Sequence, residues 1–412
     1  MGCDTVDRDR DRATSLLPPE ASIDRGHTRV GPTTVARVAN TRVVVIGGGI
    51  AGVSVAWALL DTSDPPGVVL VEAESQLAHH TTGRSAAQLI ENYGAGPVRP
   101  LTRASLGFLR SPPDDLVDGP LLRPRSLLMV ATEQQDSIVD TTLAGDPGST
   151  PSIVEITPRE AAERFPPLRI ERIHRAVLEP DSSDIDVAGL HQAFVRGLRR
   201  RGGEIRTSSR VDSVEPDGAG WRVHTNQGEL GADLVVNAAG AWGDLVAETA
   251  GVAPVGLRPL RRTAFMVTAP SDAAGWPLTA DIEHHWYLKP DGAQLLCSPG
   301  DETPSEPCDA RPEEIDIAIA IERINEATTL NISSIASSWA GLRTFSPDGS
   351  MVLGPEPTRP TFVWCVGQGG TGIQTAPGAG RLVADLVEHG TPGATFDAVQ
   401  LDLPGLLPDR FR

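Results

Sequence analysis

The sequence predicts an α/β protein with a doubly wound, Rossmann-type domain and a second, mixed α+β domain. Three observations lead to this fold class. An apolar strand, a glycine turn, a helix and a second strand follow one another over residues 42–72. Two further glycine turns follow short apolar strands near residues 240 and 370. Strand-like segments separate these stretches, so several strand ends are expected to meet at one edge of a sheet.

The stretch that begins at Arg42 is predicted to be a βαβ unit. Its first strand, residues 43–46, is entirely apolar, as expected for a strand buried on both faces. The helix that follows carries Ile50, Val53, Trp57 and Leu60 on one face. A second apolar strand, residues 68–71, completes the unit.

A glycine turn joins this strand to the helix. Gly47, Gly49 and Gly52 have the spacing Gly-x-Gly-x-x-Gly, which lets a pyrophosphate approach the unpaired N–H groups of a helix N-terminus. Glu72 ends the second strand, where a carboxylate binds the ribose hydroxyls of an adenosine and repels a 2′-phosphate. We therefore predict a dinucleotide site that disfavours NADP.

The remaining elements follow from periodicity and end signals. A helix is predicted over residues 186–201, because apolar residues recur every four positions and an arginine triplet precedes a glycine. Strands are expected around residues 205, 214, 221–223 and 234–236. Residues 312–330 alternate like a strand, but Pro312 and the two glutamates after it are typical of a helix start, and we predict a helix. The last block is a strand at 362–366, a glycine turn and a helix.

Composition and charge exclude several classes of protein. The chain has 412 residues, of which 40% are apolar, and its net charge of −18 disfavours nucleic acids and anionic membranes as partners. The four cysteines show neither metal-ligand spacing nor a disulfide framework, so no metal site is expected and a reducing cytoplasm fits best. No apolar run approaches the roughly 18 residues that span a bilayer. Residues 1–40 are polar and are expected to be a disordered tail.

The second and third glycine segments favour FAD over NAD. They lie far apart in the sequence, yet both follow short apolar strands, as expected when several strand ends converge on one long cofactor. The sequence has no second strand–glycine–helix–acid unit that would bind a pyridine nucleotide. It also lacks a Cys-x-x-x-x-Cys pair, which argues against a disulfide reductase.

Six segments then resemble one family: Thr81–Ala87, Val235–Trp242, Arg261–Arg262, Tyr287–Pro290, Trp339–Arg343 and Gly369–Thr375. Together they are similar to the D-amino-acid oxidase superfamily of flavoenzymes, and within it to the bacterial D-arginine dehydrogenases, over nearly everything from Arg42 to Glu388. The resemblance implies a glutathione-reductase-like FAD-binding domain assembled from residues 41–93, 181–251 and 341–400. It implies a substrate-binding domain from residues 94–180 and 252–340.

The resemblance also implies how FAD is held. The helix entered at Gly372 would direct its positive end toward the flavin pyrimidine ring, which stabilises the reduced form. The related sarcosine oxidases anchor flavin through a cysteine just before the residue that matches Arg343. Gly341 and Leu342 stand there in this chain, so we predict non-covalent FAD. The residues expected to contact FAD are Gly47, Gly49, Ile50, Ala51, Gly52, Glu72, Ala73, Thr82, Gly83, Arg84, Ser85, Ala86, Val211, Ala239, Gly240, Trp242, Gly369, Gly370, Thr371, Gly372, Ile373 and Gln374.

The resemblance further implies an amino-acid or amine substrate. Its carboxylate would lie in a cage of Arg262, Arg343, Tyr93 and Tyr287, and the carbonyl of Gly370 would accept a hydrogen bond from the amine. The composition adds a hint, because the chain has only two tyrosines and both stand at these positions. Two alternatives stay open: Arg343 as a structural ion-pair residue, and Arg261 in place of Arg262 as the inward-facing arginine.

A dedicated catalytic base is not evident in the sequence. The resemblance implies that the loop from Thr81 to Gln88 lines the flavin; His79 and His80 precede this flavin loop and are expected to be solvent histidines. An amine that binds in its unprotonated form needs no base.

Two positions depart from the D-arginine dehydrogenase pattern. Those enzymes carry a histidine where this chain has Gln88, and a glutamate for the substrate guanidinium where it has Leu127. A cation held against an apolar residue loses its hydration without compensation. Because Leu278 and Ala280 are expected on the same wall, we predict a D-amino acid with a neutral or apolar side chain, and D-arginine should be a poor substrate.

The electron acceptor and the biological reaction have alternatives. Residues 294–297 lack the lysine with which sarcosine oxidases help oxygen react, so we expect a quinone or a carrier protein as acceptor, with oxygen as the alternative. A biosynthetic amine oxidase acting on a modified, N-substituted or carrier-linked amino acid fits Gln88 and Leu127 equally well. A flavin monooxygenase and a flavin-binding subunit without turnover are further alternatives.

Overall fold

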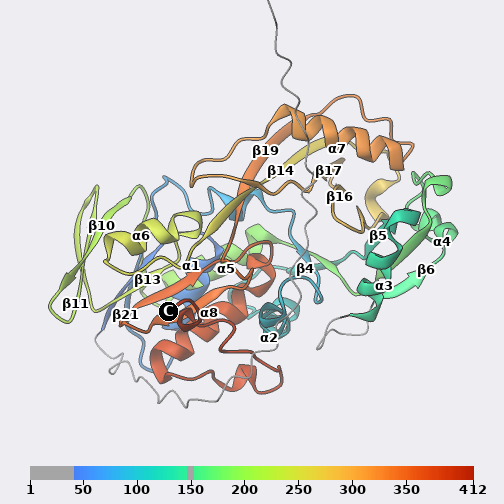
Figure 1. Cartoon of the computed structure of the whole chain (residues 1–412). Helices are drawn as coiled ribbons and strands as arrows, with labels where there is room; N and C mark the ends of the chain where they lie inside the picture. Colours follow the sequence, from blue (N-terminus) through green and yellow to red (C-terminus); the bar gives the residue numbers. More distant parts are fainter. Residues whose placement is uncertain (1–40, 146–152) are drawn as a thin grey trace, which may run out of the picture. The chain divides into compact units, whose positions relative to one another are not determined.

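The computed structural model describes residues 41–145 and 153–412. The predicted disordered tail, residues 1–40, lies outside the described residues. Two sheets, one of six strands and one of nine, account for most of the strands (Figure 1). The helices are α1 (Ile50–Leu60), α2 (Arg99–Arg110), α3 (Asp136–Ala144), α4 (Pro158–Arg164), α5 (Val187–Arg200), α6 (Gly243–Thr249), α7 (Glu314–Ala327) and α8 (Gly372–His389).

The six-stranded sheet has the order β20-β21-β13-β1-β2-β9. Neighbouring strands run parallel, except for the antiparallel pair of β20 and β21. The predicted α/β class and the βαβ unit are therefore confirmed. The strands are β1 (Arg42–Ile46), β2 (Gly67–Val71), β9 (Glu204–Arg206), β13 (Leu234–Asn237), β20 (Val352–Glu356) and β21 (Arg359–Val366).

Helices cover one face of this sheet, and a small antiparallel sheet with α6 covers the other. On the helical face, α1, α2, α5 and α8 share one buried apolar cluster with β1 and β2. Trp221 and Val223 of the small sheet β10 (Val211–Asp217), β11 (Gly220–Thr225) and β12 (Gly228–Ala232) are buried on the opposite face. The single apolar face expected for α1 is too narrow, because every α1 residue except Ala51 is buried between the sheet, α5 and α8.

The nine-stranded sheet has the order β18-β14-β17-β16-β15-β5-β7-β6, and β19 pairs with β14. The helix α7 lies on one face and confirms the helix predicted within residues 312–330. The opposite face carries Leu127 and Tyr287 in a second apolar cluster. The strands are β5 (Leu127–Ala131), β6 (Val154–Ile156), β7 (Arg175–Glu179), β14 (Arg258–Thr268), β15 (Leu278–Asp281), β16 (Tyr287–Asp291), β17 (Gln294–Ser298), β18 (Thr303–Pro304) and β19 (Ser337–Phe345).

A further small sheet has three short strands, in the order β3 (Gln88–Leu89), β8 (Ser183–Ile185) and β4 (Leu122–Pro124).

All strands of the six-stranded sheet come from the ranges expected for the FAD-binding domain, whereas β19 crosses the expected boundary at residue 341. The helix α2 falls in an expected substrate-domain range, yet its Leu101 and Leu109 belong to the cluster around β1. The two-domain division stays a prediction.

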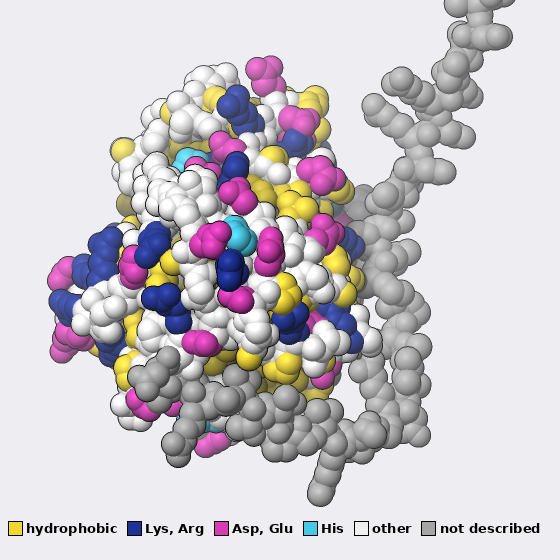
Figure 2. Space-filling view, turned by 90° about the vertical axis from the view of Figure 1, so that its left-hand side faces the viewer, with side chains coloured by type: hydrophobic (Ala, Val, Ile, Leu, Met, Phe, Trp, Pro, Cys, Tyr) yellow, Lys and Arg dark blue, Asp and Glu magenta, His cyan; other side chains and the backbone are white. Residues whose placement is uncertain are grey.

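Within residues 41–145 and 153–412, no helix combines the length and the apolar character needed to cross a membrane. On the face that Figure 2 presents, acidic and basic side chains of the described residues are interspersed rather than gathered by sign.

Candidate active site

The glycine turn after β1 packs so closely against its neighbours that a side chain would not fit at two of its positions. Gly47 has a φ of +111°, and a Cβ there would lie 2.4 Å from the carbonyl oxygen of Ala238. A Cβ on Gly52 would lie 1.9 Å from the carbonyl oxygen of Gly47. These two glycines therefore bring the turn against the end of β13 and against the first turn of α1. Gly47 lines a cavity beside the turn, whereas Gly52 does not.

Glu72 connects the end of β2 to the same turn. Its Oε2 accepts a hydrogen bond of 2.7 Å from the backbone N–H of Gly48, and its Oε1 accepts one of 2.8 Å from the N–H of Glu74. The side chain lines the cavity. A carboxylate fixed in this way is a hydrogen-bond acceptor at the edge of the site, as the sequence predicts; its contact with a ribose stays a prediction.

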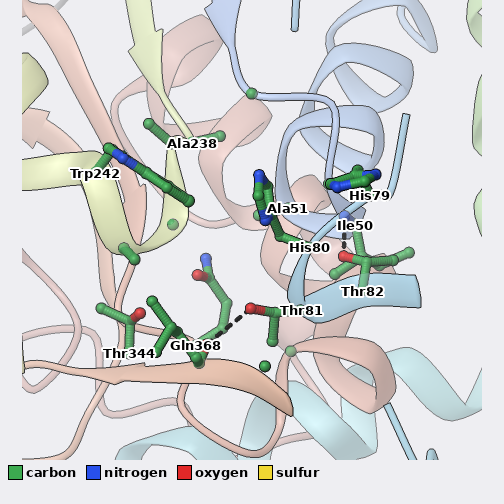
Figure 3. Close-up of a pocket in the computed structure, with 18 of the residues that line it drawn as sticks. Ile50, Ala51, His79, His80, Thr81, Thr82, Ala238, Trp242, Thr344 and Gln368 are labelled. Atoms are coloured by element: carbon green, nitrogen blue, oxygen red, sulfur yellow. Dashed lines mark hydrogen bonds between the residues drawn. The ribbon is translucent and has the colours of Figure 1, made fainter. Parts of the chain in front are cut away.

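The cavity has a volume of about 500 Å³, and three distant parts of the chain line it, as the glycine segments predict. Figure 3 shows Ile50 and Ala51 of α1, the loop from His79 to Thr82, and Trp242 bordering it. The predicted cofactor residues that line it are Gly47, Gly49, Ile50, Ala51, Glu72, Ala73, Thr82, Arg84, Ser85, Ala86, Val211, Ala239, Gly240, Trp242, Gly369, Gly370, Gly372 and Ile373.

Four predicted cofactor residues do not line the cavity: Gly52, Gly83, Thr371 and Gln374. The side chain of Gln374 is buried elsewhere, where its Oε1 accepts from the N–H of Ile90 at 3.0 Å and its Nε2 donates to the Ile90 carbonyl at 3.1 Å. The expected contact of this side chain with FAD is therefore not supported. Gln374 instead ties α8 to the loop that precedes Tyr93.

The loop from Ala78 to Arg84 lies closer to the cavity than the sequence suggests. The N–H of Ala78 donates to the Gly48 carbonyl at 3.2 Å, which folds the loop back onto the glycine turn. His79 and His80 consequently line the cavity and are half-buried, whereas the sequence suggests histidines in solvent. His80 lies between Glu74, 2.9 Å from its Nε2, and the ring of Trp242, 4.9 Å between centroids. Because this contact joins residues far apart in the sequence, no local sequence pattern predicts it.

The same loop is fastened to α1 and to β19. The Oγ1 of Thr82 accepts from the N–H of Ile50 at 3.0 Å, and the Oγ1 of Thr81 donates to the Leu342 carbonyl at 2.8 Å (Figure 3). Arg84 donates to the Ala340 carbonyl at 2.8 Å and pairs with Asp309. The flavin loop predicted from the resemblance is thus held between the two large sheets.

Three predicted substrate residues meet at the far end of the cavity. Arg343 of β19 lines it, and its guanidinium donates to the hydroxyl of Tyr93 at 3.3 Å. A Cβ on Gly370 would lie 2.9 Å from that hydroxyl and 3.1 Å from the Arg343 guanidinium, so the Gly370 backbone is the third member.

Arg343 is a cation without an acidic partner. Among the described residues, none forms an ion pair with it. Burial opposes its charge, but Tyr93, Tyr287 and Glu302 nearby more than offset this, and the pKa of Arg343 is raised. Because its accessible surface opens on the cavity, the guanidinium is placed to bind an anion there.

The pairing of β14 with β19 decides which of the two neighbouring arginines faces the cavity. Arg262 lies opposite Gly341, which puts its side chain on the same face as that of Arg343. It lines the cavity, donates to the Asp301 carbonyl at 2.7 Å and pairs with Glu302 at 2.9 Å. Arg261 points to the opposite face, where it pairs with Glu313 and Asp316. The structure therefore favours Arg262 over the alternative Arg261.

Tyr287 and Leu127 belong to one buried apolar cluster. Tyr287 lines the cavity and is paired with Ala280 of β15, and Leu127 is paired with Leu278 of the same strand. Leu127, Leu278 and Ala280 thus share one apolar cluster with Tyr287, but none of the three lines the cavity, and their role as a wall for the substrate side chain stays a prediction. Glu179, buried on β7 directly opposite Leu127, is a carboxyl group that the sequence analysis missed.

Gln88 lies outside this cluster. Its Nε2 donates to the Arg125 carbonyl at 2.7 Å, while its buried Oε1 has no hydrogen-bond partner in the described part of the chain. Its role as a substrate residue stays a prediction.

Comparisons with known proteins agree with this geometry. A family model described as "DAO: FAD dependent oxidoreductase" matches residues 42–386. The FAD-dependent oxidoreductase domain-containing protein 1 of Mus musculus is 26% identical over 398 residues, which cover 84% of this chain and 81% of that protein. The crystal structure of glycine oxidase from Geobacillus kaustophilus, 23% identical, gives a TM-score of 0.76 over 89% of this chain and 98% of its own. That of L-proline dehydrogenase from P. horikoshii, 21% identical, gives 0.78 over 90% and 98%.

The residues present fit the cofactor of this family. The glycine turn, the carboxylate of Glu72 and the N-terminus of α8 all border one cavity, as a dinucleotide with a flavin ring requires. The family model covers far more than half of the chain, and the predicted superfamily is confirmed. The chain therefore belongs to the FAD dependent oxidoreductase (DAO) family, and its cofactor is FAD.

Proposed function

We propose that this chain oxidises an amino acid at the bond between its α carbon and its nitrogen, giving an imine. One observation carries the proposal. Arg343 opens on the flavin cavity beside Tyr93 and the Gly370 backbone, and no acidic side chain in the described residues forms an ion pair with it. Such a guanidinium suits a substrate carboxylate. Relatives named for glycine and L-proline support this substrate class.

Each residue of the site has a binding or orienting task. Arg343 and the hydroxyl of Tyr93 hold the carboxylate, and the Gly370 carbonyl accepts an N–H of the amine, so the α C–H is directed into the cavity. FAD, when bound, accepts the hydrogen and the electron pair of that C–H bond. Arg262 and Tyr287 close the cage from the face of the nine-stranded sheet.

The apolar cluster supports a substrate side chain that is neutral or apolar. Leu127 is 3% exposed and lies beside Leu278, so a guanidinium placed there would lose its hydration without gaining a partner. The D configuration is proposed from the resemblance of the sequence to D-arginine dehydrogenases, a closeness that the comparisons do not confirm, and the change from glutamate to Leu127 argues against D-arginine itself.

The acceptor is proposed to be a quinone or a carrier protein rather than oxygen. The sole lysine of the chain, Lys289, is 2.8 Å from Asp184 and is almost fully buried. It is not among the residues that line the cavity. A lysine that could help oxygen react with the flavin is therefore not supplied by the described residues.

Anaerobic flavin reduction by a panel of amino acids tests the proposal. We expect D-alanine, D-valine or D-leucine to bleach the flavin faster than their L-enantiomers and faster than D-arginine. A preference for D-arginine or D-lysine would refute the side-chain assignment, and a preference for L-amino acids would refute the configuration. If no amine bleaches the flavin, the oxidation itself is refuted. Reoxidation by air within about a second in a stopped-flow instrument, on the scale of typical enzyme turnover, would refute the acceptor assignment.

A further inference from the structure

His284 is held in an unusual backbone conformation next to the substrate cage. It lies in the turn between β15 and β16 with a φ of +59°, which costs a residue with a side chain about 1 kcal/mol. Its N–H donates to the Asp281 carbonyl at 2.9 Å, and the Asp281 carboxylate accepts from the N–H groups of His285 and Trp286. The turn is thus fixed by one aspartate.

A second segment, at Gly300, packs against the backbone of this turn. Gly300 has a φ of +67°, and a Cβ there would lie 1.8 Å from the carbonyl oxygen of His284. The backbone of residue 300 therefore contacts the backbone of His284 directly, and only glycine allows it. Strained positions that the surroundings hold on several sides are often functional, because they aim one side chain.

The His284 ring is aimed at Tyr93. The two rings meet edge to face, with 6.3 Å between centroids and an angle of 81°. The hydroxyl of Tyr93 is the group that accepts from Arg343, so His284 lies one residue away from the carboxylate site. Within residues 41–145 and 153–412, the ring nitrogens of His284 have no hydrogen-bond partner, whereas those of His191 and His285 bond to Gly48 and Asp281.

Burial favours the neutral form of the His284 ring, in which one nitrogen has a free lone pair. Burial lowers its pKa most; Arg262 and Arg343 lower it further, while Asp281 and Glu302 raise it. Tyr93 and Tyr287 are the other titratable groups of the cage. A substrate carboxylate that pairs with Arg343 would cancel part of the positive field, so the imidazole becomes more basic when the substrate binds.

We propose that His284 is the base that takes a proton from the substrate ammonium, an inference that rests on the proposed amino-acid oxidation. One N–H bond of the ammonium breaks, an N–H bond forms on the imidazole, and the electron pair stays on the substrate nitrogen. The imidazolium then releases the proton to solvent. The neutral amine can donate its lone pair as the α C–H bond breaks, which an ammonium cannot do.

The pH dependence of anaerobic flavin bleaching by D-alanine and D-leucine tests this role. His284→Asn suits the left-handed backbone, and His284→Gly removes the ring without strain. We expect both variants to bleach at least about tenfold more slowly at pH 7, and to gain rate with pH until the ammonium ionises by itself. Imidazole added to His284→Gly should restore part of the rate. The matched control is His285→Gln, whose ring faces Asp281, and it should keep the wild-type profile.

Binding of benzoate, a carboxylate without an amine, separates catalysis from structure. The affinity of the protein for benzoate, measured from the shift of the flavin spectrum, should change less than about threefold in the His284 variants. This is well under the tenfold change that corresponds to about 1.4 kcal/mol. A wild-type pH profile in these variants would overturn the inference while leaving the proposed oxidation intact. Parallel loss of benzoate affinity would also overturn it, because His284 would then only support Tyr93. If no amino acid bleached the flavin of the wild-type protein, both the role of His284 and the proposed oxidation would be refuted.

Discussion

Replacing Arg343 with methionine should separate binding of the substrate carboxylate from the stability of the fold. The guanidinium donates to one neutral group, the Tyr93 hydroxyl at 3.3 Å, and forms no ion pair with the described residues. In the folded protein without substrate, Tyr93, Tyr287 and Glu302 nearby offset the cost of burying its charge, but no ion pair within the described residues ties the guanidinium to the fold. Methionine has a similar length and fills the space without a charge.

The two expected effects differ in size. Removing one partner of an enclosed charge pair costs about 2–5 kcal/mol of binding, which corresponds to roughly a 30- to 4000-fold weaker affinity for the carboxylate. Replacing Arg343 removes one hydrogen bond to a neutral group, so the stability of the unliganded fold should change by no more than about 1.5 kcal/mol.

Benzoate titration by flavin absorbance and thermal unfolding without ligand measure the two effects. Arg262→Met is the comparison variant, because Arg262 already pairs with Glu302 and bonds to the Asp301 carbonyl. It should weaken benzoate less and lower the melting temperature. A melting temperature of Arg343→Met several degrees below wild type would identify Arg343 as a structural residue, and an unchanged benzoate affinity would remove it from the carboxylate site.

Three further substitutions probe other parts of the site. Gly52→Ala should abolish flavin binding, since its Cβ would lie 1.9 Å from the Gly47 carbonyl oxygen. Gly231→Ala, whose Cβ would meet nothing within 4 Å, should retain the flavin absorbance that reports binding. Equal flavin content in the two variants would contradict this account of the turn. Leu127→Glu should raise the bleaching rate of D-arginine relative to D-leucine at least about tenfold, and an unchanged ratio would show that Leu127 does not contact the substrate side chain. Burial raises the pKa of Glu179 to about 7, partly offset by hydrogen bonds from Asn92, so the folded state favours the protonated form and loses stability as the pH rises from about 4.5 through 7. Glu179→Gln should therefore stabilise the protein at pH 8, by about 3 kcal/mol at most, and hardly at pH 4.5; equal melting-temperature shifts at both pH values would disprove this.

The parts of the fold that the sequence predicts are those with local causes. The turn at Gly47, the strand before it and the helix after it follow from apolar runs and from a turn that only glycine can close. The helix α7 follows from its proline and its acidic first turn. The cofactor followed from the same signals, because each glycine segment marks a strand end.

Other features depend on contacts between distant residues, which no local pattern encodes. His79 and His80 face the cavity because Ala78 bonds to Gly48, thirty positions earlier in the chain. His284 is aimed by Asp281 on one side and by Gly300 on the other, and neither carries a sequence signal for a base. Gln374 lies in the first turn of α8, two residues after the last glycine of the segment, yet it bonds to Ile90 because that loop packs on α8.

The choice between Arg261 and Arg262 shows how the register of one strand pair sets the chemistry. Alternation along β14 predicts that the two side chains point to opposite faces, but not which face meets the cavity. The ion pairs of Arg261 with Glu313 and Asp316 supply the answer, because they fasten that side chain to α7 on the far side of the sheet. A slip of one residue would break both pairs and turn Arg262 away from Arg343. The acidic start of α7 thus helps to orient an arginine that it never contacts, and the cage depends on a helix outside the site.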